Sequence, residues 1–181
     1  MKKLALVFVS ALISLSTFAQ EKTVMVGGAA MYPSKNIVEN AVNSKDHTTL
    51  VAAVTAAGLV ETLQSAGPFT VFAPTNAAFG KLPAGTVETL VKPENKATLT
   101  AILTYHVVAG KLSVADIVGK IKAGNGTASL TTVQGGTLKA SLKGKSVILT
   151  DEKGGTSTVT IADVNQSNGV IHVIDTVVLP K

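Results

Sequence analysis

The chain has 181 residues, of which 46% are hydrophobic, and a formal net charge of +5 at pH 7. It contains no cysteine, which excludes disulfides, a cysteine nucleophile and a lipid-modified cysteine. Every basic residue other than histidine is lysine, and tryptophan is absent. This composition disfavours nucleic-acid binding, because phosphates and bases are recognised through bidentate arginine contacts and stacking on aromatic side chains.

The first 19 residues have the features of a secretory signal peptide. Lys2 and Lys3 precede an apolar run over 4–15, and the triplet 17–19 has the small-x-small pattern of a cleavage site. The apolar stretch ending at Ala19 is shorter than the about 20 residues that cross a membrane. We therefore expect cleavage after Ala19, secretion of residues 20–181 to the periplasm or the extracellular medium, and no transmembrane segment after cleavage.

The remaining residues predict one domain preceded by a short extension. We assign 20–33 as an N-terminal extension and 34–181 as a single domain, because this length can bury a core of its own. The apolar spacing is mostly helical over 34–122 and mostly strand-like over 127–179. Helices that are segregated from a run of antiparallel strands predict an α+β fold.

The helix-rich half also contains two strand patterns. In chain order the predicted elements are a helix after the cap Ser34, a helix over 48–57 that stops at Gly58, a further turn over 59–63, a strand over 69–73, a helix capped by Thr75 or Asn76, a helix from Pro93 to about Leu103, a strand over 105–108, and a helix after the capping box Ser113–Asp116.

The later half predicts short strands separated by turns. Apolar and polar residues alternate over 138–142 and 158–161, and glycine-containing breaks lie at 135–136, 143–145 and 154–155. A final strand is predicted over 170–179, and there Val170, His172 and Ile174 share one face.

Three segments together closely resemble conserved parts of the fasciclin domain. The segment 67–79 (GPFTVFAPTNAAF) resembles its first conserved block, 105–108 (YHVV) its Tyr-His motif, and 168–175 (NGVIHVID) its second conserved block. The resemblance runs from about Asn36 to Leu179. It implies a fasciclin-like wedge or sandwich of two β-sheets, with a helical layer from the N-terminal half.

The resemblance implies a role in adhesion. Members of the family usually bind cell surfaces, matrix or other proteins, they are not usually enzymes, and small bacterial members are commonly single secreted domains. We therefore expect a secreted, non-enzymatic module with a protein, cell-surface or matrix partner. Some relatives carry apolar pigments, so the alternative is a carrier of a small apolar ligand, a lipid or a pigment, which needs an open apolar pocket.

A set of residues in the two conserved blocks is expected to support the fold rather than to bind a partner. This set comprises Thr70, Phe72, Pro74, Thr75, Asn76, Phe79, Asn168, Gly169 and His172. Asn168-Gly169 is predicted as a tight turn into the last strand. His172 is predicted to be a hydrogen-bonded core histidine, because one strand histidine offers a metal no second ligand.

Two pairs are the candidates for partner binding. Tyr105-His106 lies where the resemblance suggests an adhesive or a structural role. Neighbours in a strand point to opposite faces, so one of the pair would face the core and the other the surface. Asp163-Val164 resembles an Asp-Ile pair of receptor-binding relatives, in which an exposed carboxylate beside an apolar side chain meets the partner. The alternatives are a buried, hydrogen-bonded His106 and an Asp163 that orders the turn into the last strand.

Catalytic signatures are missing from the sequence. It has no Gly-x-Ser-x-Gly, no His-Glu-x-x-His, no phosphate-binding loop and no dinucleotide-binding fingerprint. His47, His106 and His172 are too widely spaced to indicate a zinc site. We therefore predict no catalytic residues, no metal and no cofactor.

Overall fold

The computed structural model describes residues 22–181, and the predicted signal peptide at 1–19 lies outside the described residues. The helices are α1 (Ile37–Ala41), α2 (Thr48–Ala57), α3 (Val60–Gln64), α4 (Asn76–Gly80), α5 (Thr86–Leu90), α6 (Lys96–Tyr105) and α7 (Val114–Ala123), with 3-10 turns at Lys45–His47 and Pro93–Asn95. The strands are β1 (Val24–Val26), β2 (Ala29–Met31), β3 (Phe69–Pro74), β4 (Val107–Ala109), β5 (Thr127–Thr131), β6 (Thr137–Lys143), β7 (Ser146–Thr150), β8 (Thr156–Gln166) and β9 (Gly169–Ile174).

Local capping signals explain where several helices begin and end. Ser113 and Asp116 form the predicted capping box of α7, and Gly58 ends α2 in a left-handed conformation with φ of 72°. The first helix begins later than predicted, because Asn36 rather than Ser34 forms a capping box with its third helical residue. These signals act over three or four residues, so they can be recognised from sequence alone.

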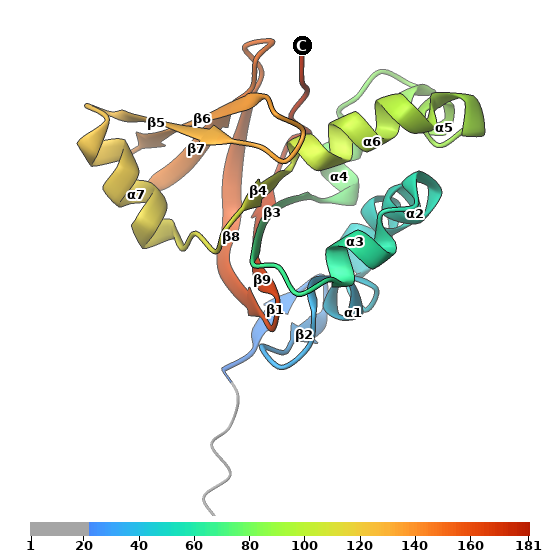
Figure 1. The fold of residues 1–181 in the computed structure, drawn as a ribbon, viewed down its shortest axis with the longest axis horizontal. Helices are drawn as coiled ribbons and strands as arrows, with labels where there is room; N and C mark the ends of the chain where they lie inside the picture. Colours follow the sequence, from blue (N-terminus) through green and yellow to red (C-terminus); the bar gives the residue numbers. More distant parts are fainter. Residues whose placement is uncertain (1–21) are drawn as a thin grey trace, which may run out of the picture.

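Strands β3 to β9 form one large, bent sheet in the order β4-β3-β9-β8-β7-β6-β5. Strands β3 and β9 pair in parallel, and all other neighbours in this sheet are antiparallel. A bridge between Val108 and Thr132 connects β4 to the residues after β5, so the sheet nearly closes on itself (Figure 1). The α+β class is confirmed, and the two layers of the predicted wedge are two arms of one sheet joined through β8.

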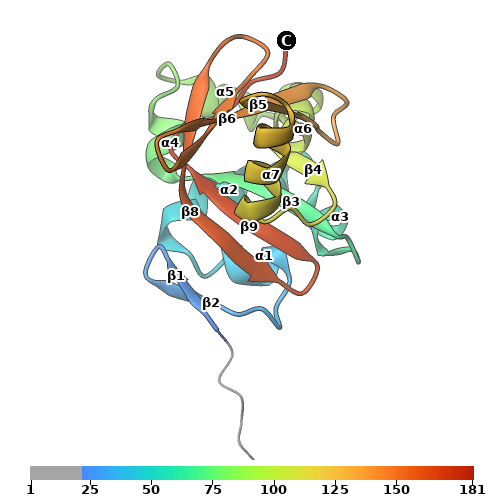
Figure 2. The same cartoon turned by 90° about the vertical axis from the view of Figure 1, so that its left-hand side faces the viewer.

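Helices lie on both sides of strands β3 and β9. Helices α1–α6 gather on one side and α7 lies on the other, as the ribbon shows (Figure 1). Seen from the side, α7 stands in front of β3 and β9 (Figure 2). Side chains of β3 alternate between the two cores this creates, with Val71 and Ala73 in one and Phe72 in the other. Burial on both faces explains why β3 and β9 are nearly continuous apolar runs.

One predicted strand begins too early. Tyr105 is the last residue of α6 and His106 is its C-terminal cap, so β4 starts only at Val107. The β-branched pair that follows gave the segment 105–108 the pattern of a strand. The tertiary structure instead extends the preceding helix to the tyrosine.

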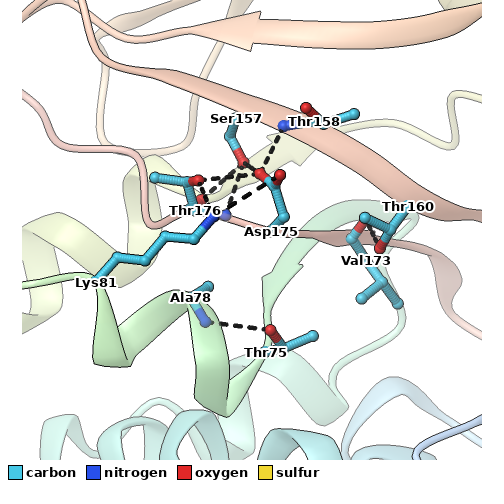
Figure 3. A network of polar contacts seen from close by, with 9 residues as sticks. All are labelled: Thr75, Ala78, Lys81, Ser157, Thr158, Thr160, Val173, Asp175 and Thr176. Atoms are coloured by element: carbon cyan, nitrogen blue, oxygen red, sulfur yellow. Dashed lines mark hydrogen bonds and ion pairs between the residues drawn. The ribbon is translucent and has the colours of Figure 1, made fainter.

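The last strand ends at Ile174 rather than at Leu179, because Asp175 folds back onto the start of β8 (Figure 3). The Oδ1 atom of Asp175 accepts hydrogen bonds from the amide of Thr158 at 2.8 Å and the hydroxyl of Thr176 at 3.0 Å. The Nζ atom of Lys81 lies 3.8 Å from Oδ2. Burial alone would raise the pKa of Asp175, but these hydrogen bonds outweigh it and the pKa lies below its ordinary value.

The predicted N-terminal extension belongs to the folded unit. Strands β1 and β2 form an antiparallel hairpin, and Val26 and Met31 are buried in the core beneath α1–α6. The amide of Lys45 donates a hydrogen bond to the carbonyl of Gly27, which fastens the hairpin to the turn before α2. Residues 24–31 therefore pack with the domain that we predicted to begin at Ser34.

Candidate functional site

Tyr105 and His106, one of the two pairs predicted to bind a partner, are both buried, with 0% and 2% of their surfaces exposed. The expectation that one of them faces solvent is wrong, because the pair ends a helix and does not follow the alternation of a strand. The hydroxyl of Tyr105 donates to the carbonyl of Thr137 at 2.8 Å and accepts from the amide of Glu152 at 3.2 Å. Burial raises the pKa of Tyr105, so the hydroxyl keeps its proton and joins α6 to two strand ends.

His106 is held by a hydrogen bond at each ring nitrogen. Its Nδ1 donates to the carbonyl of Ile102 at 2.8 Å, and its Nε2 accepts from the amide of Val178 at 3.2 Å. Burial lowers the pKa of His106 to about 4, so the ring is neutral at physiological pH. His106 is therefore a buried, hydrogen-bonded histidine, which was the alternative to a role in partner binding.

His172 is also a hydrogen-bonded core histidine, as predicted. Its Nε2 donates to the carbonyl of Leu112 at 2.8 Å, and its Nδ1 accepts from the amide of Asp163 at 3.2 Å. The ring stacks on Phe72 with centroids 5.7 Å apart. Burial lowers the pKa of His172 and keeps it neutral.

Asp163 and Val164, the second predicted pair, lie in an irregular part of β8 where the register with β9 shifts. Val164 is buried in the core, so the apolar member of the predicted pair does not face solvent. Asp163 is half-buried with φ of 55°, and its Oδ1 accepts from the amide of Val114 at 2.8 Å. The carboxylate thus caps the first turn of α7, and the alternative that it orders the turn into β9 is wrong.

Asn168 lies in the predicted turn between β8 and β9, and its side chain connects three segments. Its Oδ1 accepts from the amide of Ile37 at 3.1 Å, which fixes the start of α1. Its Nδ2 donates to the carbonyls of Leu63 and Ser65 at 2.8 and 2.9 Å, which fixes the end of α3. Gly169 next to it is required for packing, because a Cβ atom there would lie 2.1 Å from the carbonyl oxygen of Phe69.

The first conserved block is structural as well. Thr70 donates through Oγ1 to the carbonyl of Gly110 at 2.7 Å and accepts from the amide of Leu112 at 2.9 Å. Thr75 caps α4 through a hydrogen bond from the amide of Ala78 at 3.2 Å, as predicted.

Asn76, the other residue considered as the cap of α4, is instead the first residue of that helix. Its Oδ1 accepts from the amide of Thr49 at 3.0 Å, and its Nδ2 donates to the carbonyl of Lys45 at 2.8 Å, so it fastens the start of α2. Phe72, Pro74 and Phe79 are buried apolar residues.

An apolar cavity of about 180 Å³ lies between helices α1–α3 and the sheet. Its wall includes Val38, Leu50 and Val54 from the helices and Val71 from β3. Among residues 22–181, no Asp, Glu, Lys or Arg lines it. The sequence alone left open whether such a pocket exists, because its wall is assembled from helices and strands that are far apart in the chain.

Over residues 22–181 no group of three histidine or acidic side chains is placed to hold a metal ion. The same part of the chain contains no helix with the length and apolar character needed to span a bilayer.

Comparisons with known proteins agree with the fold and with the conserved segments. The family model for the fasciclin domain matches residues 45–180. Protein sll1483 of Synechocystis is 49% identical over 161 residues, which are 88% of this chain and 82% of that protein. Immunogenic protein MPB70 of Mycobacterium bovis is 41% identical over 143 residues, 76% of this chain and 65% of that protein.

Among solved structures, a FAS1 domain pair from the insect cell adhesion molecule Fasciclin I superposes with a TM-score of 0.71 at 18% identity. The match covers 82% of this chain and 52% of that one. At this level of identity the similarity shows a shared fold.

Proposed function

The chain belongs to the fasciclin domain family, and we propose that it acts outside the cytoplasm as a non-enzymatic interaction module for a protein, cell-surface or matrix partner. The observation that carries this proposal is how the polar side chains of the conserved segments are used. His106, His172 and Asn168 direct their side-chain hydrogen bonds to the protein's own backbone. A catalytic nucleophile, base or orienting group would have to offer such atoms to a substrate.

Secretion is part of this proposal. It is supported by the positive, apolar and small residues that follow one another over 1–19. The adhesive role is supported by the shared fold with the insect cell adhesion molecule.

Within this proposal, Asp163 is the member of the two predicted pairs that meets the partner. Its side chain is half-buried and Oδ1 is engaged by the amide of Val114, so Oδ2 would make the contact. Tyr105, His106 and Val164 are buried, and we propose that they support the domain from inside.

A cell-binding assay with matched variants tests this role. Surfaces coated with residues 20–181 are exposed to cells of the source organism, and the bound cells are counted against an albumin control. Asp163→Asn keeps an oxygen that can accept from Val114 but removes the charge. Asp116→Asn is the matched control, because Asp116 is an exposed carboxylate at the same end of α7.

We expect the wild type and Asp116→Asn to bind cells, and Asp163→Asn to lose binding while keeping its melting temperature. Binding by all three proteins would remove Asp163 from the contact surface. No binding above albumin by the wild type would contradict the adhesive role.

A second candidate function is the carriage of a small apolar ligand. The observation that favours it is the cavity between α1–α3 and the sheet. Mass spectrometry of solvent extracts from protein purified from its native source tests this candidate. A stoichiometric lipid or other apolar compound would support it, and extracts that contain none would count against it.

A further inference from the structure

The cavity between α1–α3 and the sheet has the size of a small-molecule site. Its volume of about 180 Å³ is close to the roughly 150 Å³ of engineered apolar cavities that bind benzene. Val42 and Val133 line it and are each about half exposed, so it reaches the surface. It therefore suits a molecule, or the end of a chain, with about six to eight non-hydrogen atoms.

The wall carries few polar side chains, and among the described residues His47 is the one with a buried ring nitrogen that lacks a partner. His47 lines the cavity and is only 2% exposed, and its Nε2 has no hydrogen-bond partner in the structure. Its Nδ1 is 2.9 Å from the hydroxyl of Ser44, which holds the ring in place. Among the described residues, Nε2 of His47 is the one buried side-chain nitrogen or oxygen without a partner.

The other two histidines show that this protein satisfies its buried imidazoles. His106 and His172 are each hydrogen-bonded at both nitrogens. Leaving a buried polar atom unpaired is unfavourable, so an orphaned nitrogen at a cavity wall marks where a ligand atom can bind.

The charge of the surroundings restricts the ligand further. Burial lowers the pKa of His47, and the nearby Ala73 carbonyl and Asp46 carboxylate offset only part of this effect, so the ring is neutral. Because the part of the chain that the structure describes places no Lys or Arg on the cavity wall, an anionic head group would lose its hydration without gaining a counter-ion. A hydroxyl both donates and accepts, so it can pair with either neutral tautomer of His47.

We propose that the cavity binds a small neutral alcohol, or the hydroxyl-bearing end of a larger apolar molecule, with its oxygen hydrogen-bonded to Nε2 of His47. This inference rests on the second candidate function, the carriage of an apolar ligand, and specifies its head group. The apolar part of the ligand packs against Val54, Leu50 and Val71.

The probes are benzyl alcohol and toluene, which have the same ring and differ by the hydroxyl. Residues 20–181 labelled with ¹⁵N-histidine are titrated with each probe, and the imidazole nitrogen resonances are followed by NMR. His106 and His172 serve as internal controls. We expect benzyl alcohol to shift the Nε2 resonance of His47 selectively, and toluene to bind without moving it toward a hydrogen-bonded value.

Two variants add a measure of affinity. In His47→Leu we expect benzyl alcohol to bind about tenfold more weakly, as for one lost hydrogen bond, while toluene binding stays within about twofold. Val54→Phe fills the cavity and should abolish binding of both probes.

The results separate the two levels of the proposal. If both probes bind and benzyl alcohol leaves the Nε2 resonance of His47 unmoved, the role of His47 is overturned while the cavity remains a binding site. If the wild type binds neither probe at millimolar concentration, the carrier function fails together with the inference.

Discussion

The Nε2 atom of His106 accepts a hydrogen bond from the amide of Val178, 3.2 Å away, and so ties the end of α6 to the segment after the final strand. A backbone amide can only donate, so Nε2 must be the unprotonated nitrogen of the ring. Adding a proton there would replace the acceptor with a second donor facing the amide of Val178. The contact therefore depends on a neutral histidine and makes the fold sensitive to acid.

We expect the protein to lose stability between neutral pH and pH 5. His106 has a pKa of about 4 in the folded state against 6.5 for an ordinary histidine, so the unfolded chain binds the extra proton first. This stability is present above pH 6.5 and is lost as the pH falls toward 4. His106 alone should lower the free energy of unfolding by about 2 kcal/mol between pH 7.5 and pH 5. Urea unfolding at the two pH values measures this.

A variant separates His106 from the other groups that titrate. His47 and His172 also have lowered pKa values, so they add to the loss over the same range. His106→Leu should be less stable than the wild type at pH 7.5, and its stability should change less with pH. Equal pH dependence in the two proteins would show that His106 does not titrate as described.

The Tyr105 hydroxyl provides a second test of the helix end. Tyr105→Phe removes the donor to the carbonyl of Thr137 and the acceptor for the amide of Glu152 but keeps the buried ring. We expect a loss of about 1–2 kcal/mol in the free energy of unfolding, measured in urea. Tyr32→Phe, at an exposed tyrosine, is the control and should change stability by less than about 0.5 kcal/mol. A similar loss in both variants would contradict a specific role for Tyr105.

Asn168 should be among the most sensitive polar positions of the chain. Asn168→Ala leaves the amide of Ile37 and the carbonyls of Leu63 and Ser65 without their side-chain partner. We expect the free energy of unfolding to fall by about 3 kcal/mol, seen as a lower urea midpoint. Asn165→Ala, at an exposed asparagine in β8, should cost less than about 0.5 kcal/mol. If the two variants are equally stable, Asn168 does not connect the helices as the geometry indicates.

The sequence predicts those parts of this fold that depend on short-range signals. The capping box of α7, the stop of α2 at Gly58 and the core position of His172 could all be recognised from neighbouring residues. The position of Asp163 could not, because its partner at Val114 lies 49 residues away in the chain. The same holds for the cavity, and His47 becomes notable only once its neighbours show that one nitrogen is left unpaired.

The close approach of β3 and β9 leads to the last prediction. A Cβ atom on Gly169 would lie 2.1 Å from the carbonyl oxygen of Phe69 and 3.0 Å from its amide nitrogen. Both atoms belong to the backbone at the start of the parallel pair, so Gly169→Ala must push the two strands apart. We expect a loss of about 3 kcal/mol in the free energy of unfolding, with faster amide hydrogen exchange in β3 and β9.

Gly80→Ala is the matched control for this substitution. Gly80 is the last residue of α4, and a Cβ atom there meets nothing within 4 Å. Alanine also favours helix over glycine, so this variant should be as stable as the wild type or slightly more stable. If Gly169→Ala were tolerated equally well, the contact between Gly169 and Phe69 would have to be looser than this geometry allows. The parallel pairing would then not depend on glycine at the turn.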